Sequence, residues 1–130
     1  MYTKTSILII DDEKDFCELV IHILHGEPFS IECAHTVLEA RKMLTVRNPD
    51  FILLDNNLPD GKGIDFLRDR NALFTNSKVI MMTADTSDSL RQIAFQWGIY
   101  EFLVKPFSFI KLRELISAVP DVVLDFVLQK

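Results

Sequence analysis

The sequence has no long apolar run and no excess of basic residues. None of its apolar runs approaches the roughly 20 residues that a membrane-spanning helix needs, and residues 1–4 lack the apolar stretch of a signal peptide. The 19 acidic residues outnumber the 14 basic ones, which gives a net charge of −5. Because binding to nucleic-acid phosphates needs a basic face, this balance argues mildly against such a surface. We expect neither a membrane segment nor a nucleic acid bound to this chain.

Cysteine is also scarce, since the chain has only Cys17 and Cys33. Their spacing matches no metal-binding or redox motif. Both fall in apolar segments, so the sequence predicts two buried free thiols. Free thiols are typical of a reducing cytosol, and we therefore expect a cytoplasmic protein.

The chain is rich in apolar segments of two kinds, continuous apolar runs and segments with apolar residues at helical spacing, and the two kinds alternate along the sequence. With 130 residues, 48% of them hydrophobic and 25% charged, it fits one globular domain with a real core. Continuous apolar runs predict buried strands, and helical spacing of apolar residues predicts a helix after each of them. The expected strands are residues 6–10, 29–34, 50–54, 78–82 and 100–104, and the expected helices are residues 14–25, 37–47, 64–72, 85–97 and 108–119. Strands alternating with helices indicate an α/β fold with a parallel sheet covered on both faces.

Polar residues of different chemical kinds follow four of these strands. Asp11 and Asp12 follow the first strand, Asp55 the third, Thr83 the fourth and Lys105 the fifth. In a parallel sheet these carboxyl ends share one edge, where ligands bind. Like charges about 4 Å apart repel by about 4 kcal/mol at an effective dielectric constant near 20, so three clustered carboxylates need compensation. One ammonium leaves −3 + 1 = −2, which predicts a divalent cation and phosphoryl-transfer chemistry.

Taken one at a time, these residues have simpler explanations. Asp11 and Asp12 suit a helix N-cap, and Asp55 suits a turn. Thr83 alone is only a strand end, and Pro106 after Lys105 would fix the entry to the last helix. The functional interpretation depends on all of them meeting at one edge.

The same residues carry a resemblance to a known family. The chain resembles the receiver domains of bacterial two-component response regulators over residues 6–119. The matching segments are residues 7–13 (ILIIDDE), 55–61 (DNNLPDG), 82–84 (MTA) and 102–107 (FLVKPF). The resemblance implies a single-domain, doubly wound (βα)5 fold with a five-stranded parallel sheet in the flavodoxin-like strand order 2-1-3-4-5.

The resemblance also implies a metal site. Asp12 would bind Mg²⁺ directly and Asp11 would bind it through water. Asp55 and the main-chain carbonyl of Asn57 would complete the protein ligands. A hard cation of this kind takes one or two carboxylates together with water and phosphate oxygens.

The remaining implied roles concern phosphoryl transfer and signalling. Asp55 would accept a phosphoryl group from a histidine kinase or a phosphotransfer protein. Thr83 would hydrogen-bond the phosphoryl oxygen, and Lys105, followed by a cis peptide bond, would pair with it. Phe102 would be the switch aromatic, which biases the face formed by the fourth helix, the fifth strand and the fifth helix between two states. That face would pass the signal to an output domain or a downstream protein. Such a chain is a phosphoacceptor and not a conventional enzyme.

The C-terminal residues have several possible roles, and the three histidines have none in the predicted site. Residues 120–130 form an apolar C-terminal extension that either covers Trp97, makes a homodimer contact or begins a linker. His22, His25 and His35 are expected away from the pocket, as ordinary surface or edge residues.

Three other functions compete with the phosphoacceptor. A phosphate-independent receiver-like interaction module would keep the fold without the chemistry. A Mg²⁺-dependent aspartyl-phosphate hydrolase of the haloacid-dehalogenase type would need Asp-x-Asp, whereas Asp11 and Asp12 are adjacent. A flavin-binding module would need a phosphate-cradling loop, which the acidic residues 11–13 would oppose.

Overall fold

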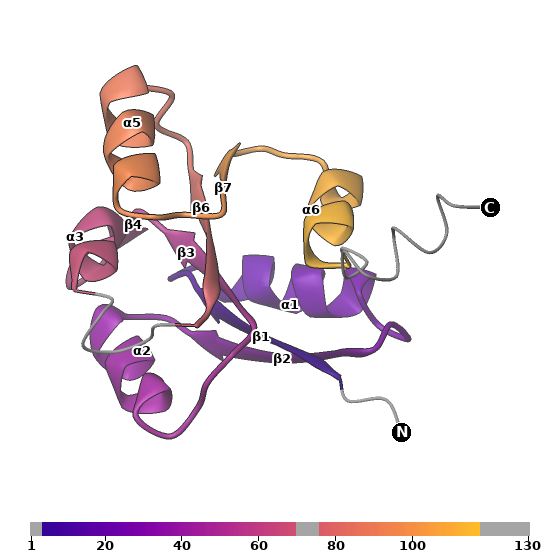
Figure 1. Ribbon diagram of the computed structural model, residues 1–130. Coiled ribbons are helices and arrows are strands. Elements are labelled where there is room, and N and C mark those ends of the chain that lie inside the picture. Colours follow the sequence, from indigo (N-terminus) through magenta and orange to yellow (C-terminus); the bar gives the residue numbers. More distant parts are fainter. Residues whose placement is uncertain (1–3, 70–75, 118–130) are drawn as a thin grey trace, which may run out of the picture.

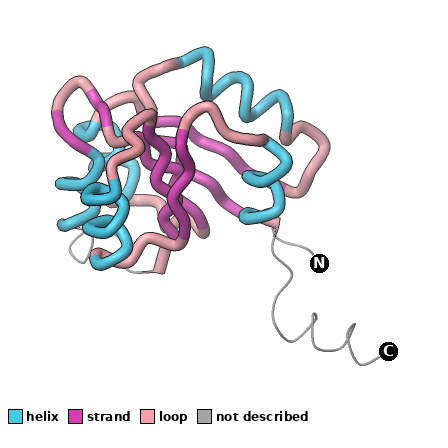
Figure 2. The backbone as a smooth tube through the Cα atoms, turned by 90° about the horizontal axis from the view of Figure 1, so that it is seen from above, coloured by secondary structure: helices cyan, strands magenta, loops and turns pink. Residues whose placement is uncertain are grey.

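One parallel sheet forms the middle layer of the protein (Figures 1 and 2). The computed structural model describes residues 4–69 and 76–117. Its five-stranded sheet has the order β2-β1-β3-β6-β7, and every pairing is parallel. Since β6 and β7 are the fourth and fifth strands of this sheet, the predicted order 2-1-3-4-5 is confirmed. The strands are β1 (Thr5–Ile10), β2 (Phe29–Ala34), β3 (Phe51–Asp55), β6 (Lys78–Thr83) and β7 (Glu101–Val104).

Helices cover both faces of this sheet (Figure 1). On one face lie α1 (Lys14–Ile23) and α6 (Phe109–Ile116), and on the other lie α2 (Val37–Leu44), α3 (Gly63–Arg68) and α5 (Asp88–Gln96). Each face has its own apolar core, because successive strand residues point to opposite sides. Ile7 and Ile9 pack on the α1–α6 face, whereas Leu8 and Ile10 pack on the other. The continuous apolar runs of the sequence follow from this two-sided burial.

Local side-chain chemistry sets several helix ends. The Thr36 hydroxyl accepts a hydrogen bond from the Glu39 N–H (3.0 Å), as an N-cap of α2. Gly98 follows α5 with φ +90°, a left-handed conformation that favours glycine. The structure starts α5 at Asp88, three residues later than the sequence predicted. The reason is a turn in which the Asp85 carboxylate accepts a hydrogen bond from the Ser87 N–H (2.8 Å).

The segment between β3 and α3, predicted as a loop, contains a short antiparallel pair. Its strands are β4 (Asn57–Leu58) and β5 (Gly61–Lys62). Between them, the Asp60 carboxylate accepts hydrogen bonds from the main-chain N–H groups of Val37 (2.7 Å) and Leu38 (3.0 Å). These bonds satisfy two free donors at the start of α2 and lower the pKa of Asp60. The hairpin is thus fastened to a neighbouring helix.

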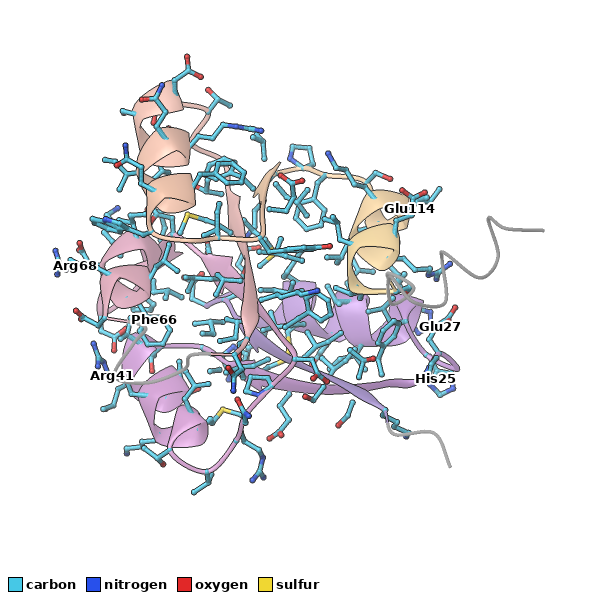
Figure 3. The ribbon with its side chains drawn as sticks, viewed as in Figure 1. His25, Glu27, Arg41, Phe66, Arg68 and Glu114 are labelled. Atoms are coloured by element: carbon cyan, nitrogen blue, oxygen red, sulfur yellow. A yellow bond between two sulfur atoms is a disulfide. The ribbon has the colours of Figure 1, made fainter. Side chains whose placement is uncertain are left out.

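A further contact between helices lies on the α2–α3 side. The Arg41 guanidinium stands over the Phe66 ring, 5.6 Å from its centroid, and reaches Asp69 at 3.4 Å (Figure 3). The arginine covers an otherwise buried aromatic ring while its charge stays near the surface.

The prediction of two free thiols is wrong. The structure joins Cys17 of α1 to Cys33 of β2 in a disulfide, with their Cα atoms 6.5 Å apart. The reason is that α1 packs over the face of the sheet toward which Cys33 points, and this Cα separation lies within the disulfide range. The disulfide removes the cysteine-based argument for a reducing compartment.

The structure describes Trp97 but not the C-terminal extension that was expected to cover it. Trp97 is partly buried against the α2–α3–α5 core. The extension at residues 120–130 lies outside the described residues, so its contact with Trp97 stays a prediction. Within residues 4–69 and 76–117, no helix has the length and apolar character that crossing a bilayer requires.

Candidate phosphoacceptor and metal site

Three aspartates converge at the carboxyl edge of the sheet. The register aligns Ile10 of β1 with Leu54 of β3, so the residues that follow in each strand lie side by side. The carboxylates of Asp11, Asp12 and Asp55 each offer an oxygen, and these oxygens all lie within 4.8 Å of one another. The spatial relationship on which the sequence interpretation depended is therefore present.

Asp11 is held firmly within this cluster. Its side chain is fully buried. One carboxylate oxygen accepts a hydrogen bond from the Glu13 N–H (2.9 Å), and the other accepts one from the Lys105 ammonium (2.7 Å). Asp12, in contrast, is exposed to solvent. The pair therefore offers one fixed and one solvent-facing carboxylate.

Asp55 ends the fully buried strand β3 and is itself only 5% exposed. Burial raises the pKa of Asp55 above its ordinary value of 3.8, whereas the Lys105 charge and the Asn57 N–H oppose that shift. The Asn57 N–H donates to one carboxylate oxygen at 3.3 Å, and the Lys105 ammonium lies 3.7 Å from the other. Asp55 thus combines burial, which favours its neutral form, with two groups that favour its anion.

A glycine lets the chain pass close to Asp55. A Cβ atom at Gly63 would collide with the main-chain oxygen of Asp55 and come within 3.0 Å of the Cα of Asn56. The Gly63 N–H instead donates to the main-chain oxygen of Asn56 (2.9 Å), whose side-chain oxygen accepts from the Ile64 N–H (2.9 Å). The start of α3 is therefore packed directly against the site.

Lys105 follows β7 and reaches across the sheet to β1. Its peptide bond to Pro106 is cis, as the resemblance implied. Its ammonium also lies 4.8 Å from the centroid of the Phe16 ring. Burial disfavours the ammonium, but the hydrogen bond and charge of Asp11, together with the Asp55 charge, outweigh it and raise the pKa of Lys105 above 10.5. Lys105 is therefore a fixed positive charge at neutral pH.

Thr83 forms part of the floor of the site. It is fully buried, and its hydroxyl accepts a hydrogen bond from the Asp85 N–H (3.1 Å). Its main-chain oxygen accepts from the Lys105 N–H (2.8 Å), which joins the ends of β6 and β7. The structure therefore brings the hydroxyl and the ammonium to the same edge as the carboxylates, as the sequence predicted.

Phe102, the expected switch residue, lies inside the protein. It is 4% exposed and packs with the α2–α3–α5 core. The Arg91 guanidinium of α5 stands over its ring at 5.7 Å and over the Phe95 ring at 5.5 Å. The ring is therefore on the inward side, beneath an exposed arginine.

One residue that the sequence placed away from the pocket lies beside it. The His35 Nδ1 atom is 2.9 Å from the main-chain oxygen of Asp11, so the position expected for this histidine is wrong. The loop after β2 reaches β1 because the two strands pair through Ile10 and Ala34. His35 follows directly after that pair, and strand order alone could have suggested its position.

The donor set suits a hard divalent cation. Three carboxylates supply anionic oxygens, and Lys105 offsets one of the three charges if all are ionised. The residual charge of −2 matches that of Mg²⁺, which prefers oxygen ligands and retains water. The residues present therefore fit the metal that the resemblance implied.

Comparison with known proteins agrees with this geometry. A sequence model of the response regulator receiver domain matches residues 7–117. The chain belongs to this family. A receiver domain is a signalling module of two-component systems, and the site described above is the edge at which its acidic residues gather.

Individual relatives show how far the similarity reaches. The receiver domain is 34% identical over 114 residues to the transcriptional regulatory protein CitB of Klebsiella pneumoniae, covering 86% of this chain and 49% of CitB. It is 32% identical over 109 residues to the KDP operon regulator KdpE of Escherichia coli, covering 84% of this chain and 48% of KdpE. The non-phosphorylated HemR receiver domain of Leptospira biflexa has a TM-score of 0.79 at 28% identity, covering 90% of this chain and 98% of that one. The chain spans about half the length of the first two relatives.

Proposed function

We propose that this receiver domain is the phosphoacceptor of a two-component phosphorelay, with Asp55 as the acceptor residue. The donor would be the phosphohistidine of a histidine kinase or phosphotransfer protein. The observation that carries the proposal is the position of the Asp55 carboxylate, which is buried, clustered with Asp11 and Asp12, and 3.7 Å from the Lys105 ammonium. Family membership favours this function over an aspartyl-phosphate hydrolase.

The transfer needs one nucleophile and fixed positive charge. A carboxylate oxygen of Asp55 attacks phosphorus, the bond between phosphorus and the donor imidazole nitrogen breaks, and that nitrogen keeps the electron pair. Catalysis of such a step is mainly positioning and stabilisation of charge on the phosphoryl oxygens. Lys105 would pair with one of these oxygens, and the Thr83 hydroxyl would bind another. The chain assists its own phosphorylation without being a conventional enzyme.

The metal ligands would be the three aspartates and one main-chain group. Asp12 and Asp55 would bind Mg²⁺ directly, Asp11 would bind through water, and the Asn57 carbonyl would complete the set. When bound, Mg²⁺ neutralises charge on the transferring phosphoryl group. The rigid contacts of Asp11 with Glu13 and Lys105 keep one carboxylate in place for this purpose.

The signal would leave through the face formed by α5, β7 and α6. A phosphoryl group adds about −1.5 to −2 charge and new acceptor oxygens, which would draw Thr83 toward Asp55. Phe102 would respond to that movement and bias the face between two states. Because Phe102 has no hydroxyl, its inward state loses no hydrogen bond.

The recipient of the signal would be an output domain, a downstream protein or a second copy of this chain. We assign residues 1–119 to the receiver domain and residues 120–130 to an extension or linker. A cytoplasmic location fits the proposed kinase partner.

The test is phosphorylation by acetyl phosphate with Mg²⁺, followed by intact mass measurement. We expect a phosphate-sized mass gain in the wild-type protein, and no gain in Asp55→Asn or with EDTA. Phosphorylation of Asp55→Asn to the wild-type extent would refute Asp55 as the acceptor. Absence of any gain in the wild-type protein would favour the phosphate-independent interaction module.

A further inference from the structure

Beyond the residues already assigned, a second ammonium stands at the rim of the site. Lys62 lies in β5 of the short hairpin, and its Nζ donates a hydrogen bond to the side-chain oxygen of Asn57 at 2.7 Å. Both residues are exposed, while Asp55 and Thr83 beneath them are buried. Lys62 therefore belongs to the solvent side of the pocket, whereas Lys105 belongs to its interior.

The opposite rim is formed by the turn after β6. The Asp85 N–H donates to the Thr83 hydroxyl, just as the Asn57 N–H donates to the Asp55 carboxylate. Hydrogen bonds from Ser87 lower the pKa of Asp85, and the positive charge of Lys62 adds to that effect. Lys62 thus contacts Asn57 directly and interacts electrostatically with Asp85.

This arrangement lies where hydrolysis of an aspartyl phosphate would begin. In hydrolysis a water oxygen attacks phosphorus, the bond from phosphorus to the Asp55 oxygen breaks, and that oxygen keeps the electron pair as free carboxylate. Inorganic phosphate leaves, and the water proton passes to it or to solvent. The attacking water must approach in line, from the side opposite the Asp55 oxygen. With Asp55 and Thr83 on the buried floor, that side is the exposed rim that carries Asn57, Lys62 and Asp85.

We propose that Lys62 is a positioning residue that prolongs the life of the aspartyl phosphate by holding the Asn57 side chain at the rim of the site. This inference rests on the proposed function of Asp55. The hydrogen bond to Asn57 would hold the lysine chain at the rim that an attacking water crosses, and the charge of Asp85 would attract its ammonium along the same rim. If Lys62 instead stabilised charge in the hydrolytic transition state, its removal would slow hydrolysis, so the sign of the effect separates the two roles.

The experiment compares the loss of the phosphoryl group in three variants. Lys62→Met keeps the chain length but removes the ammonium, Lys62→Arg restores a charged donor, and Lys42→Met is a control at an exposed position of α2. Each protein is phosphorylated with acetyl phosphate and Mg²⁺, freed of donor, and followed by intact mass. We expect Lys62→Met to lose phosphate about three- to tenfold faster than wild type, the size of one lost hydrogen bond. Lys62→Arg should return most of the lifetime, and Lys42→Met should match wild type.

A second variant separates positioning from a general loss of structure. If Lys62 acts through Asn57, then Asn57→Ala should also speed hydrolysis, and adding Lys62→Met to it should change the rate little further. Unfolding temperatures of all variants should lie close to wild type, because both side chains are exposed. An additive effect of the two substitutions would overturn the connection between them.

The outcomes distinguish this inference from the proposed function. A phosphorylated wild-type protein whose lifetime equals or falls below that of Lys62→Met would overturn the role of Lys62 and leave Asp55 as the acceptor. A wild-type protein that gains no phosphate would overturn both.

Discussion

Replacing Lys105 by methionine should destabilise the protein in the absence of metal, and Mg²⁺ should reverse much of that loss. Methionine keeps a long apolar chain against Phe16 but removes the ammonium. The Lys105 ammonium lies 2.7 Å from Asp11, whose side chain is fully buried, and 3.7 Å from Asp55. Without the ammonium and without metal, no positive charge of Lys105 offsets the repulsion between the clustered carboxylates.

The magnitude follows from these distances. At an effective dielectric constant near 20, the attraction to Asp11 is about 6 kcal/mol before the cost of desolvation. Removing one partner of a buried ion pair costs about 3–5 kcal/mol in net stability. Because the Lys105 side chain keeps 20% exposure, we expect the lower end. A loss of about 3 kcal/mol lowers the unfolding temperature of a domain of this size by about 10 °C.

Thermal unfolding with EDTA and with Mg²⁺ measures both effects. Lys105→Met should unfold earlier than wild type in EDTA, and Mg²⁺ should raise its unfolding temperature by more than it raises that of wild type. The reason is that a cation now meets a site of charge −3 instead of −2, and tighter binding gives greater stabilisation at the same concentration. The exposed Lys42→Met serves as the control. An unchanged unfolding temperature in EDTA, or an equal response to Mg²⁺, would refute this reasoning.

Three further predictions address other parts of the protein. Because burial raises the pKa of Asp55 in the folded protein, ionisation of Asp55 costs folding stability as pH rises above 3.8. Asp55→Asn should therefore be more stable than wild type in EDTA at neutral pH, and this advantage should shrink in acid. A difference in the free energy of urea unfolding that stays constant across pH would contradict the raised pKa. Since Cys17 and Cys33 are 16 residues apart, their disulfide should add about 3 kcal/mol to the free energy of unfolding. Reductant should lower the unfolding temperature of wild type but not that of Cys33→Ser. Equal unfolding temperatures of wild type with and without reductant would count against the bond. Gly63→Ala should lose about 1–3 kcal/mol of folding stability and should be phosphorylated more slowly, because the new Cβ meets the main chain of Asp55. The control Gly61→Ala, whose Cβ makes only a 3.4 Å contact with Val37, should match wild type in both unfolding and phosphorylation.

The strands and the acidic edge could be predicted because they depend on simple rules. Runs such as residues 51–54 are apolar throughout, which indicates burial on both faces, and parallel pairing then places the following residues at one edge. Asp11 and Lys105 directly follow two such strands, and Asp55 is the last residue of a third. Their meeting needed no knowledge of side-chain rotamers.

The contacts that the sequence missed depend on how neighbouring elements are rotated. The bond between Cys17 and Cys33 requires α1 to turn one particular side toward β2, and apolar spacing fixes that rotation only coarsely. The contact of His35 with Asp11 depends on one loop residue, and the capping of α2 by Asp60 depends on a hairpin 22–23 residues away. The hydrogen bond from Lys62 to Asn57 likewise depends on the short hairpin, which turn-forming residues alone did not predict.

Chemical mapping of the phosphorylated residue tests the central claim most directly. Borohydride reduces an aspartyl phosphate to homoserine, so the protein is treated with acetyl phosphate and Mg²⁺, reduced, digested and sequenced by mass spectrometry. We predict homoserine at position 55, dependent on both acetyl phosphate and Mg²⁺, with Asp11 and Asp12 unmodified. Homoserine at another position, with Asp55 intact, would contradict the account.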